Sequence, residues 1–243
     1  MSEALDLRHG KSRSAEEEAY AFLLREIRNG RLLGSTHITA ERISHELGIS
    51  RIPVREAMRR LASEGFITIR SNRGAFVTEL GADDITELYE MRAVLEGLAS
   101  RYSAERFDER GSFQAHVLLQ ELDRARSDPD WFVGAHNQFH DLINSYCPRR
   151  RLVGEIVRLR TMAEPYLRLT IQHSPTAYGE TVNEHRQLIE VLEGKHPARC
   201  EAVMRAHILG TDVLKLIPAS TGKKMRKAGL PEGLLDIARE RLE

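Results

Sequence analysis

The sequence predicts a mostly α-helical protein with two parts, an N-terminal winged helix-turn-helix domain and a C-terminal all-α bundle of six or seven helices. Two observations lead to this prediction. Residues 38–80 follow the pattern of a helix, a tight turn, a second helix and two strands. From residue 81 to residue 217, apolar residues recur at helical spacing and no strand pattern is evident. A chain of 243 residues is long enough to form two hydrophobic cores.

The second helix of the N-terminal part is expected to begin at Ser50 or Arg51. A serine hydroxyl can accept a hydrogen bond from an otherwise unpaired amide of the first helical turn. Pro53 is tolerated only in that first turn. Gly48, just before, allows the chain to reverse sharply. These features predict a helix-turn-helix. Its inward face is expected to consist of Val54, Ala57, Met58 and Leu61.

Arginines gather on the outer face of this second helix. Arg51, Arg55 and Arg59 follow one another at four-residue intervals, so their side chains share one face. Residues 50–74 contain six arginines and two glutamates, although the whole chain balances 36 basic and 36 acidic residues. Guanidinium groups neutralise phosphates and bind guanine edges in the major groove. The cluster therefore predicts a DNA-binding surface, and the alternative is an ordinary solvated helix face.

A small wing is expected to follow the second helix. Residues 66–69 and residues 75–78 alternate as strands do, and residues 70–74 form a polar turn between them. We expect the two strands to pair, with the turn available to a nucleic acid.

The remaining chain divides by composition. We expect residues 1–14 to form a mobile leader, 15–80 the winged helix-turn-helix domain, 81–217 the helical domain, and 218–243 a basic linker with a possible terminal helix. No apolar run reaches membrane-spanning length and the first twenty residues lack a signal-peptide core, so the protein is expected to be cytoplasmic. Cys147 and Cys200 are too few for a disulfide framework.

The histidines carry the chemistry that the helical domain suggests. His136 and His140 are four residues apart, so they lie on one face of a helix. His185 and His207 each sit among apolar residues at helical spacing and are expected to face inward. Neutral imidazoles bind zinc, nickel, copper or iron. Taken one at a time, each histidine could instead be a hydrogen-bonded core residue.

Residues 47–57, which read Leu-Gly-Ile-Ser-Arg-Ile-Pro-Val-Arg-Glu-Ala, resemble the GntR family of bacterial transcription regulators. Residues 59–65 and 72–77 extend the resemblance over nearly all of residues 15–80. The resemblance implies that the second helix touches an operator and that the wing turn enters the minor groove. Ile52 departs from the threonine more usual at its position. The expected DNA-binding residues are Ser50, Arg51, Ile52, Arg55, Arg59, Arg70, Asn72, Arg73 and Gly74.

The helical region resembles the FCD effector domain of the FadR-like branch of that family, through residues 92–96, 138–140, 184–185 and 206–208. The resemblance implies a divalent metal held by one aspartate and three histidines. His140, His185 and His207 match the histidines, and His136 takes the place of the aspartate. Imidazole in place of carboxylate favours zinc, nickel or copper over magnesium. Alternatively, His136 turns away and three histidines bind alone.

The resemblance further implies that the metal anchors a small carboxylate effector, with Arg92 as an effector-binding residue. We expect a homodimer that binds a palindromic DNA operator as a repressor, and whose operator affinity falls when the effector binds. A direct metal-ion sensor is one alternative. A metal-dependent hydrolase is another, but no His-Glu-x-x-His motif and no placed general base are present, so no enzyme activity is expected.

Overall fold

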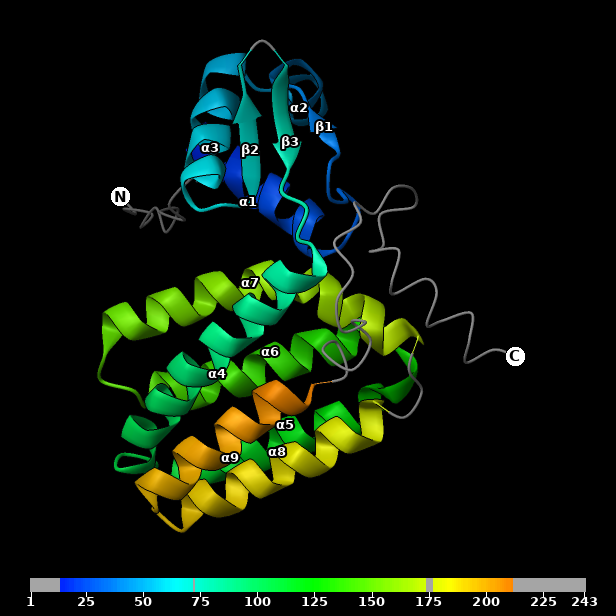
Figure 1. Cartoon of the computed structure of the whole chain (residues 1–243). Coiled ribbons are helices and arrows are strands. Elements are labelled where there is room, and N and C mark those ends of the chain that lie inside the picture. The colour runs from blue at the N-terminus through cyan, green and yellow to red at the C-terminus, as the bar shows by residue number, and fades with distance from the viewer. Residues whose placement is uncertain (1–13, 72, 174–176, 212–243) are drawn as a thin grey trace, which may run out of the picture. The chain divides into compact units, whose positions relative to one another are not determined.

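The computed structural model describes residues 14–71, 73–173 and 177–211. They form two compact units (Figure 1). The first comprises the chain up to Ile27 together with Arg31–Glu79, and the second comprises Arg28–Gly30 together with the chain from Leu80 onwards. The predicted leader, except for residue 14, and the predicted basic linker and terminal helix at 218–243 lie outside the described residues.

The first unit combines three helices with a three-stranded antiparallel sheet of order β1-β3-β2. Strands β2 and β3 confirm the predicted wing to within one residue at each end. Strand β1 was not predicted, because two residues are too short to show an alternating pattern. It pairs His37 with Phe76 and Ile38 with Ala75. The elements are α1 (Ala15–Arg28), β1 (His37–Ile38), α2 (Ala40–Leu47), α3 (Arg51–Ser63), β2 (Ile67–Arg70) and β3 (Gly74–Val77).

The turn between α2 and α3 forms as the sequence predicts. Gly48 adopts a left-handed conformation with φ of 67°, and its amide donates to the Ser44 carbonyl. Ser50 occupies the N-cap position of α3, and Pro53 lies in the first turn. One detail was wrong: the Ser50 side chain makes no capping hydrogen bond. Its hydroxyl therefore remains exposed at the start of the helix.

The apolar side of α3 builds the core of the first unit. All four residues predicted to face inward are buried, as are Leu23 of α1 and Ile43 of α2. Burying a valine, leucine, isoleucine or methionine side chain stabilises the fold by about 1.5–3 kcal/mol. The arginines of α3 remain exposed. The core thus fixes which face of α3 is presented outward.

The second unit is all-helical over its described residues, which confirms the predicted fold class. Helix α4 packs against α6, α7 and α9, and α5 packs against α6 and α8. Helix α9 ends at Gly210, and the predicted end of the helical domain at residue 217 lies outside the described residues. The helices are α4 (Ala82–Ala104), α5 (Glu109–Arg124), α6 (Pro129–Ser145), α7 (Arg150–His173), α8 (Ala177–Glu193) and α9 (Pro197–Gly210), with one short 3-10 turn at Ala125–Ser127.

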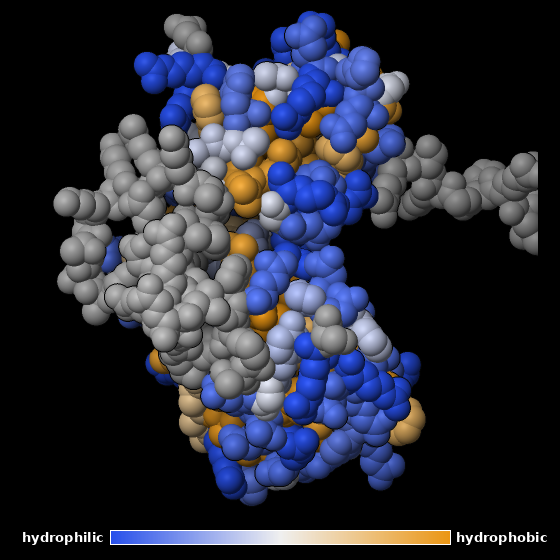
Figure 2. All heavy atoms as spheres, turned by 90° about the vertical axis from the view of Figure 1, so that its right-hand side faces the viewer, coloured by the Kyte–Doolittle hydropathy of each residue, from blue (hydrophilic) through white to orange (hydrophobic). Residues whose placement is uncertain are grey.

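The helices of the second unit bury a continuous apolar core. Phe132, Phe139 and Ile143 of α6 lie at its centre with Tyr89 of α4 and Leu122 of α5. Figure 2 shows that the visible surface is mostly hydrophilic, with apolar residues in scattered patches. Within the described ranges, no helix combines the length and the apolar composition needed to cross a bilayer.

Candidate metal centre and nucleic-acid interface

The fold brings the four predicted histidines together. His136 and His140 come from α6, His185 from α8 and His207 from α9, and one nitrogen of each ring lies within 4.8 Å of the others. All four side chains are buried, with 6% exposure or less. The sequence placed His136 and His140 on one helix face and predicted that His185 and His207 face inward, but only the packing of three helices makes them one cluster.

Two of the rings are held by hydrogen bonds at the nitrogen that points away from the cluster, and a third ring has a carboxylate near that nitrogen. His185 Nδ1 donates to the Thr181 carbonyl at 2.7 Å, and His207 Nδ1 donates to the Glu184 carboxylate at 2.7 Å. The Glu96 carboxylate lies 3.0 Å from His140 Nδ1, although off the line of a good hydrogen bond. Such outer partners fix the orientation of a histidine and leave Nε2 free to bind a metal.

The inward nitrogens fit a metal ion. Nε2 of His140 and Nε2 of His207 lie 3.3 Å apart. Two nitrogens bound to one tetrahedral zinc at about 2.05 Å would be separated by roughly the same distance. His185 Nε2 and His136 Nδ1 are buried and have no hydrogen-bond partner among the described residues. Unpaired buried nitrogens are costly, and a shared cation would satisfy all four.

The electrostatics of the cluster favour neutral rings. Burial lowers the pKa of His136, His140 and His185 well below the ordinary value for histidine. Neighbouring imidazoles lower these pKa values further, and the charge of Arg92 adds to the effect at His136 and His140. A neutral imidazole keeps the lone pair that binds a metal. The three rings are thus in the form that a divalent ion requires.

Arg92, the predicted effector-binding residue, is 3% exposed. Its guanidinium donates to Glu96 at 3.0 Å and lies 4.8 Å from the centre of the Tyr89 ring. Arg92 therefore reaches the histidine cluster through Glu96. Sequence reasoning did not identify Glu96 as a site residue, although its four-residue spacing from Arg92 is the spacing of a helical ion pair.

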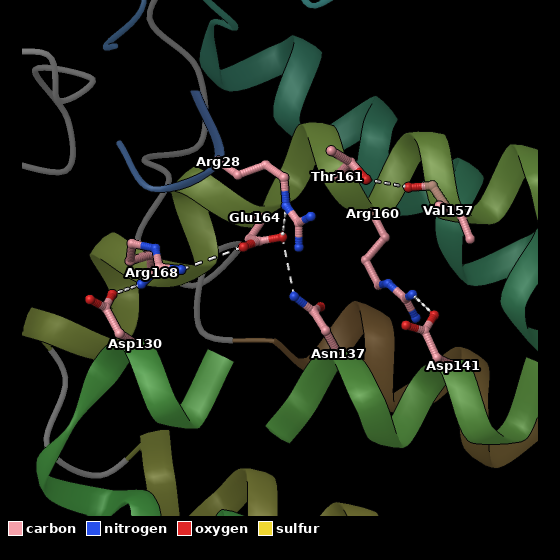
Figure 3. Close-up of polar contacts among 9 residues, drawn as sticks. All are labelled: Arg28, Asp130, Asn137, Asp141, Val157, Arg160, Thr161, Glu164 and Arg168. Carbon is pink, nitrogen blue, oxygen red and sulfur yellow. Dashed lines mark hydrogen bonds and ion pairs between the residues drawn. The ribbon is translucent and has the colours of Figure 1, made fainter. Parts of the chain in front are cut away.

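A row of polar contacts fixes α6, the helix that carries His136 and His140, against α7 (Figure 3). Asn137 donates to Glu164 at 3.1 Å, Arg160 pairs with Asp141, and Arg168 pairs with Asp130. The Glu164 carboxylate also accepts from Arg28 at 2.8 Å. Because Asn137 and Asp141 directly follow the two histidines in sequence, these contacts hold the axial position of the helix that carries His136 and His140.

A small pocket opens beside the cluster. Its volume is about 20 Å³, which is room for a water molecule. His136 and His207 form its buried floor, and Glu180, Glu184 and Thr211 are among its walls. Arg92 does not line this pocket. Sequence reasoning missed both glutamates, although Glu184 stands next to His185.

The predicted DNA-binding residues of α3 lie on its exposed side. Ile52 is 72% exposed, so its apolar side chain is available to a thymine methyl group. Arg51 pairs with Glu41 at 2.5 Å, and Arg59 pairs with Glu56. Arg55 is exposed and makes no ion pair within the described part of the chain. Exposed pairs of this kind are weak, so all three arginines remain available to phosphates.

The wing presents Arg70, Arg73 and Gly74 on its surface. Asn72, also predicted to bind DNA, lies outside the described residues. The Arg70 guanidinium lies 4.7 Å from the centre of the Phe76 ring, and Gly74 has φ of 85°. A positive φ of this size favours glycine, so the turn depends on the residue type found there.

Two family models match the chain. Residues 15–77 match the bacterial regulatory proteins of the gntR family, and residues 87–210 match the FCD domain. The chain belongs to the GntR family of bacterial transcriptional regulators. Both resemblances seen in the sequence are thereby confirmed, and the protein is a DNA-binding regulator.

Two relatives agree with this assignment, and one solved structure has the same fold. The chain is 29% identical to a probable D-xylose utilization operon transcriptional repressor of Paenarthrobacter nicotinovorans, over 77% of this chain and 82% of that protein. It is 24% identical to the transcriptional repressor RspR of Escherichia coli, over 79% and 85%. The fold matches E. coli McbR/YncC with a TM-score of 0.72 at 21% identity, over 82% and 95%. The relatives are transcriptional regulators, not enzymes.

Proposed function

We propose that this regulator is a homodimeric, cytoplasmic repressor whose affinity for a palindromic operator changes when a small organic acid binds at a divalent metal in the helical unit. The metal would be held by His136, His140, His185 and His207. Zinc suits a set of four nitrogens best, with nickel and copper as the other candidates. The observation that supports this most is the convergence of four buried imidazoles in the domain that matches the FCD family.

On the DNA side, a dimer would place two α3 helices in successive major grooves. Ser50, Arg51, Ile52, Arg55 and Arg59 would contact that groove, because they occupy the start and the exposed side of α3. The wing turn would reach the adjacent minor groove. The repressor role is supported by two relatives that are named as repressors. The expected wing contacts are Arg70, Asn72, Arg73 and Gly74.

A bound metal would supply a positive charge that attracts a carboxylate. Thr181 and Glu184 orient the rings of His185 and His207 through hydrogen bonds, and the Glu96 carboxylate lies 3.0 Å from Nδ1 of His140. The aromatic ring of Phe139, whose centre lies 4.4 Å from that of the His185 ring, excludes water from one side. The ligands come from α6, α8 and α9. A bound acid can therefore change the relative positions of three helices, provided that it binds one arrangement more tightly than another.

A direct metal sensor is the second candidate, and one observation favours it. His136, His140, His185 and His207 offer four nitrogens, which would be enough to hold a zinc ion without any ligand from outside the protein, as closed structural sites do. In that case the metal itself would be the signal. An acid effector requires either a five-coordinate metal or the departure of one histidine.

The test uses protein purified without a His-tag. Metal content is measured for the wild type and for His140→Ala, and binding to duplexes from the protein's own promoter region is followed by fluorescence anisotropy. We expect about one metal per chain in the wild type, and much less in the variant. Operator affinity that changes with an acid only in the metal-loaded protein supports the proposal, whereas equal and negligible metal in both proteins would refute it.

Affinity that changes with metal alone, without any organic acid, would support the sensor instead. The two candidates are thus separated by one titration of metal and one of acid against the same duplex.

A further inference from the structure

The wing sheet gathers three side chains on one face. His37 of β1 lies directly opposite Phe76 of β3, and the two rings stack with their centres 4.9 Å apart and their planes 29° from parallel. Strand β2 lies on the other side of β3, and its Arg70 guanidinium is 4.7 Å from the centre of the same Phe76 ring. Figure 1 shows the three strands side by side. The Phe76 ring therefore joins a histidine and an arginine into one surface of the wing.

His37 also reaches the wing turn. Its Nε2 atom would lie 2.5 Å from a Cβ atom placed on Gly74, so the edge of the ring occupies the space that a side chain there would need. His37 is exposed, and among the described residues its ring nitrogens have no hydrogen-bond or ion-pair partner. The polar edge of the ring is thus free to meet a ligand at the place where the wing is expected to contact DNA.

The charges around His37 are positive. Strands β2 and β3 and the turn between them, residues 67–77, contain two charged side chains, Arg70 and Arg73, and no carboxylate. The residues of the three strands that neighbour the ring are uncharged: Thr36, Ile38, Thr68, Gly74 and Phe76. A protonated His37 would therefore add a positive charge beside Arg70 without a carboxylate to neutralise it. Cations that converge on one surface attract a phosphate.

Contact between the wing and DNA belongs to the function proposed above, and we propose in addition that His37 is a further operator contact. Its protonated ring donates from Nε2 to a DNA phosphate beside the wing turn, next to the charge of Arg70. A neutral ring offers a weaker hydrogen bond and no charge, so operator binding takes up a proton from solvent. Affinity is then highest at acidic pH, and it falls as pH rises through the range in which histidine loses its charge, between about 5 and 8.

Two measurable quantities report such a contact. A hydrogen bond to an ionised group is about twice as strong as one between neutral groups, so the charged ring raises operator affinity. Each additional phosphate that a protein neutralises also steepens the fall of affinity with salt by about one counterion. A histidine that only packs against Phe76 would change neither quantity with pH.

The experiment measures operator affinity of the full-length protein by fluorescence anisotropy, with duplexes from its own promoter region, over a salt series at about pH 6 and about pH 8. We expect wild-type affinity to fall about three- to tenfold between the two pH values, on the basis of one charge-assisted hydrogen bond. The salt dependence should be steeper at the lower pH by about one phosphate per subunit.

Two substitutions of His37 separate charge from packing. His37→Gln keeps a neutral donor, and we expect it to lose most of the pH dependence and to bind at both pH values as the wild type does at the higher one. His37→Lys keeps its charge throughout this range, so it should bind tightly at both pH values. His116→Gln is the matched control, because His116 is an exposed histidine of α5 in the second unit, and it should behave as the wild type. Urea denaturation checks that each variant folds.

The outcomes distinguish this inference from the proposed function. If His37→Gln retains the pH dependence of the wild type, or if the wild type shows none, the His37 contact is overturned while operator binding stands. Arg70→Ala tests the wing itself: unchanged operator affinity at both pH values in Arg70→Ala and in His37→Gln would show that the wing does not touch DNA. Failure of the wild type to bind any duplex from its promoter region would refute the proposed operator binding and the inference with it.

Discussion

The two units differ in whether the charged and polar side chains of their candidate sites are exposed or buried. In the first, the α3 arginines that are predicted to bind DNA are exposed, and the core beneath them only fixes the direction in which they point. In the second, four histidines, Arg92 and Glu96 are buried, and most of them require a partner inside the protein. An exposed charge is solvated by water and needs no partner in the protein, whereas a buried charge is tolerated only when it is paired. The helical unit should therefore be far more sensitive to single changes.

The largest effect is expected from removing a histidine at the centre of the proposed metal site. His140→Ala deletes the ring whose Nε2 lies 3.3 Å from that of His207 and leaves Glu96 without a partner on that side. We expect metal to be lost from the purified protein, with at least about a hundredfold weaker zinc affinity in chelator competition. His116→Ala is the control, because His116 is exposed on α5, lies outside the histidine cluster and pairs with Glu193. A similar loss of zinc affinity in His116→Ala would contradict the assignment of His140 to the metal site.

Glu96 tests the buried site separately, because it contacts His140 but is not one of the four proposed ligands. Glu96→Gln keeps the shape but removes the charge that faces Arg92 and His140, and we expect zinc affinity to fall about 10- to 100-fold. Glu96→Ala should also destabilise the fold by about 3–5 kcal/mol, because Arg92 is left buried and unpaired. Chelator competition and urea denaturation measure the two effects. Unchanged zinc affinity in Glu96→Gln would show that Glu96 does not contribute to the site. The control is Glu90→Gln, because Glu90 is exposed on the same helix.

The same contrast explains what the sequence could and could not predict. The helix-turn-helix was predictable because Gly48, Pro53 and the arginine spacing act locally. The inward direction of His185 and His207 was predictable from helical periodicity. Glu96, Glu184 and the pocket beside them were not, because they become neighbours of the histidines only when α4, α6, α8 and α9 pack together. Strand β1 was missed because its pairing with β3 is non-local.

On the exposed side of the comparison, smaller effects are expected. Arg55→Ala should weaken operator binding about tenfold and lower the salt dependence of binding by about one phosphate contact. Metal content and folding stability should stay unchanged, because the side chain is exposed. Fluorescence anisotropy across a series of salt concentrations measures both quantities. Arg101→Ala, an exposed arginine of α4, is the control. Loss of fold in Arg55→Ala would contradict the view that this surface is independent of the core beneath it.

The smallest effect concerns the wing, where the backbone rather than a charge is the constraint. Gly74→Ala meets two costs: φ of 85° disfavours an L-residue by about 1–2 kcal/mol, and the added Cβ would lie 2.5 Å from Nε2 of His37. Gly30→Ala is the matched control, since Gly30 has φ of 68° but no heavy atom within 4 Å of the added Cβ. We expect both variants to lower the free energy of unfolding, Gly74→Ala by more, because His37 must move and its pairing with Phe76 is disturbed. An equal loss of unfolding free energy in the two variants, measured in urea, would show that His37 can move aside without destabilising the fold. The wing would then tolerate substitution as the exposed arginines do, unlike the buried histidines.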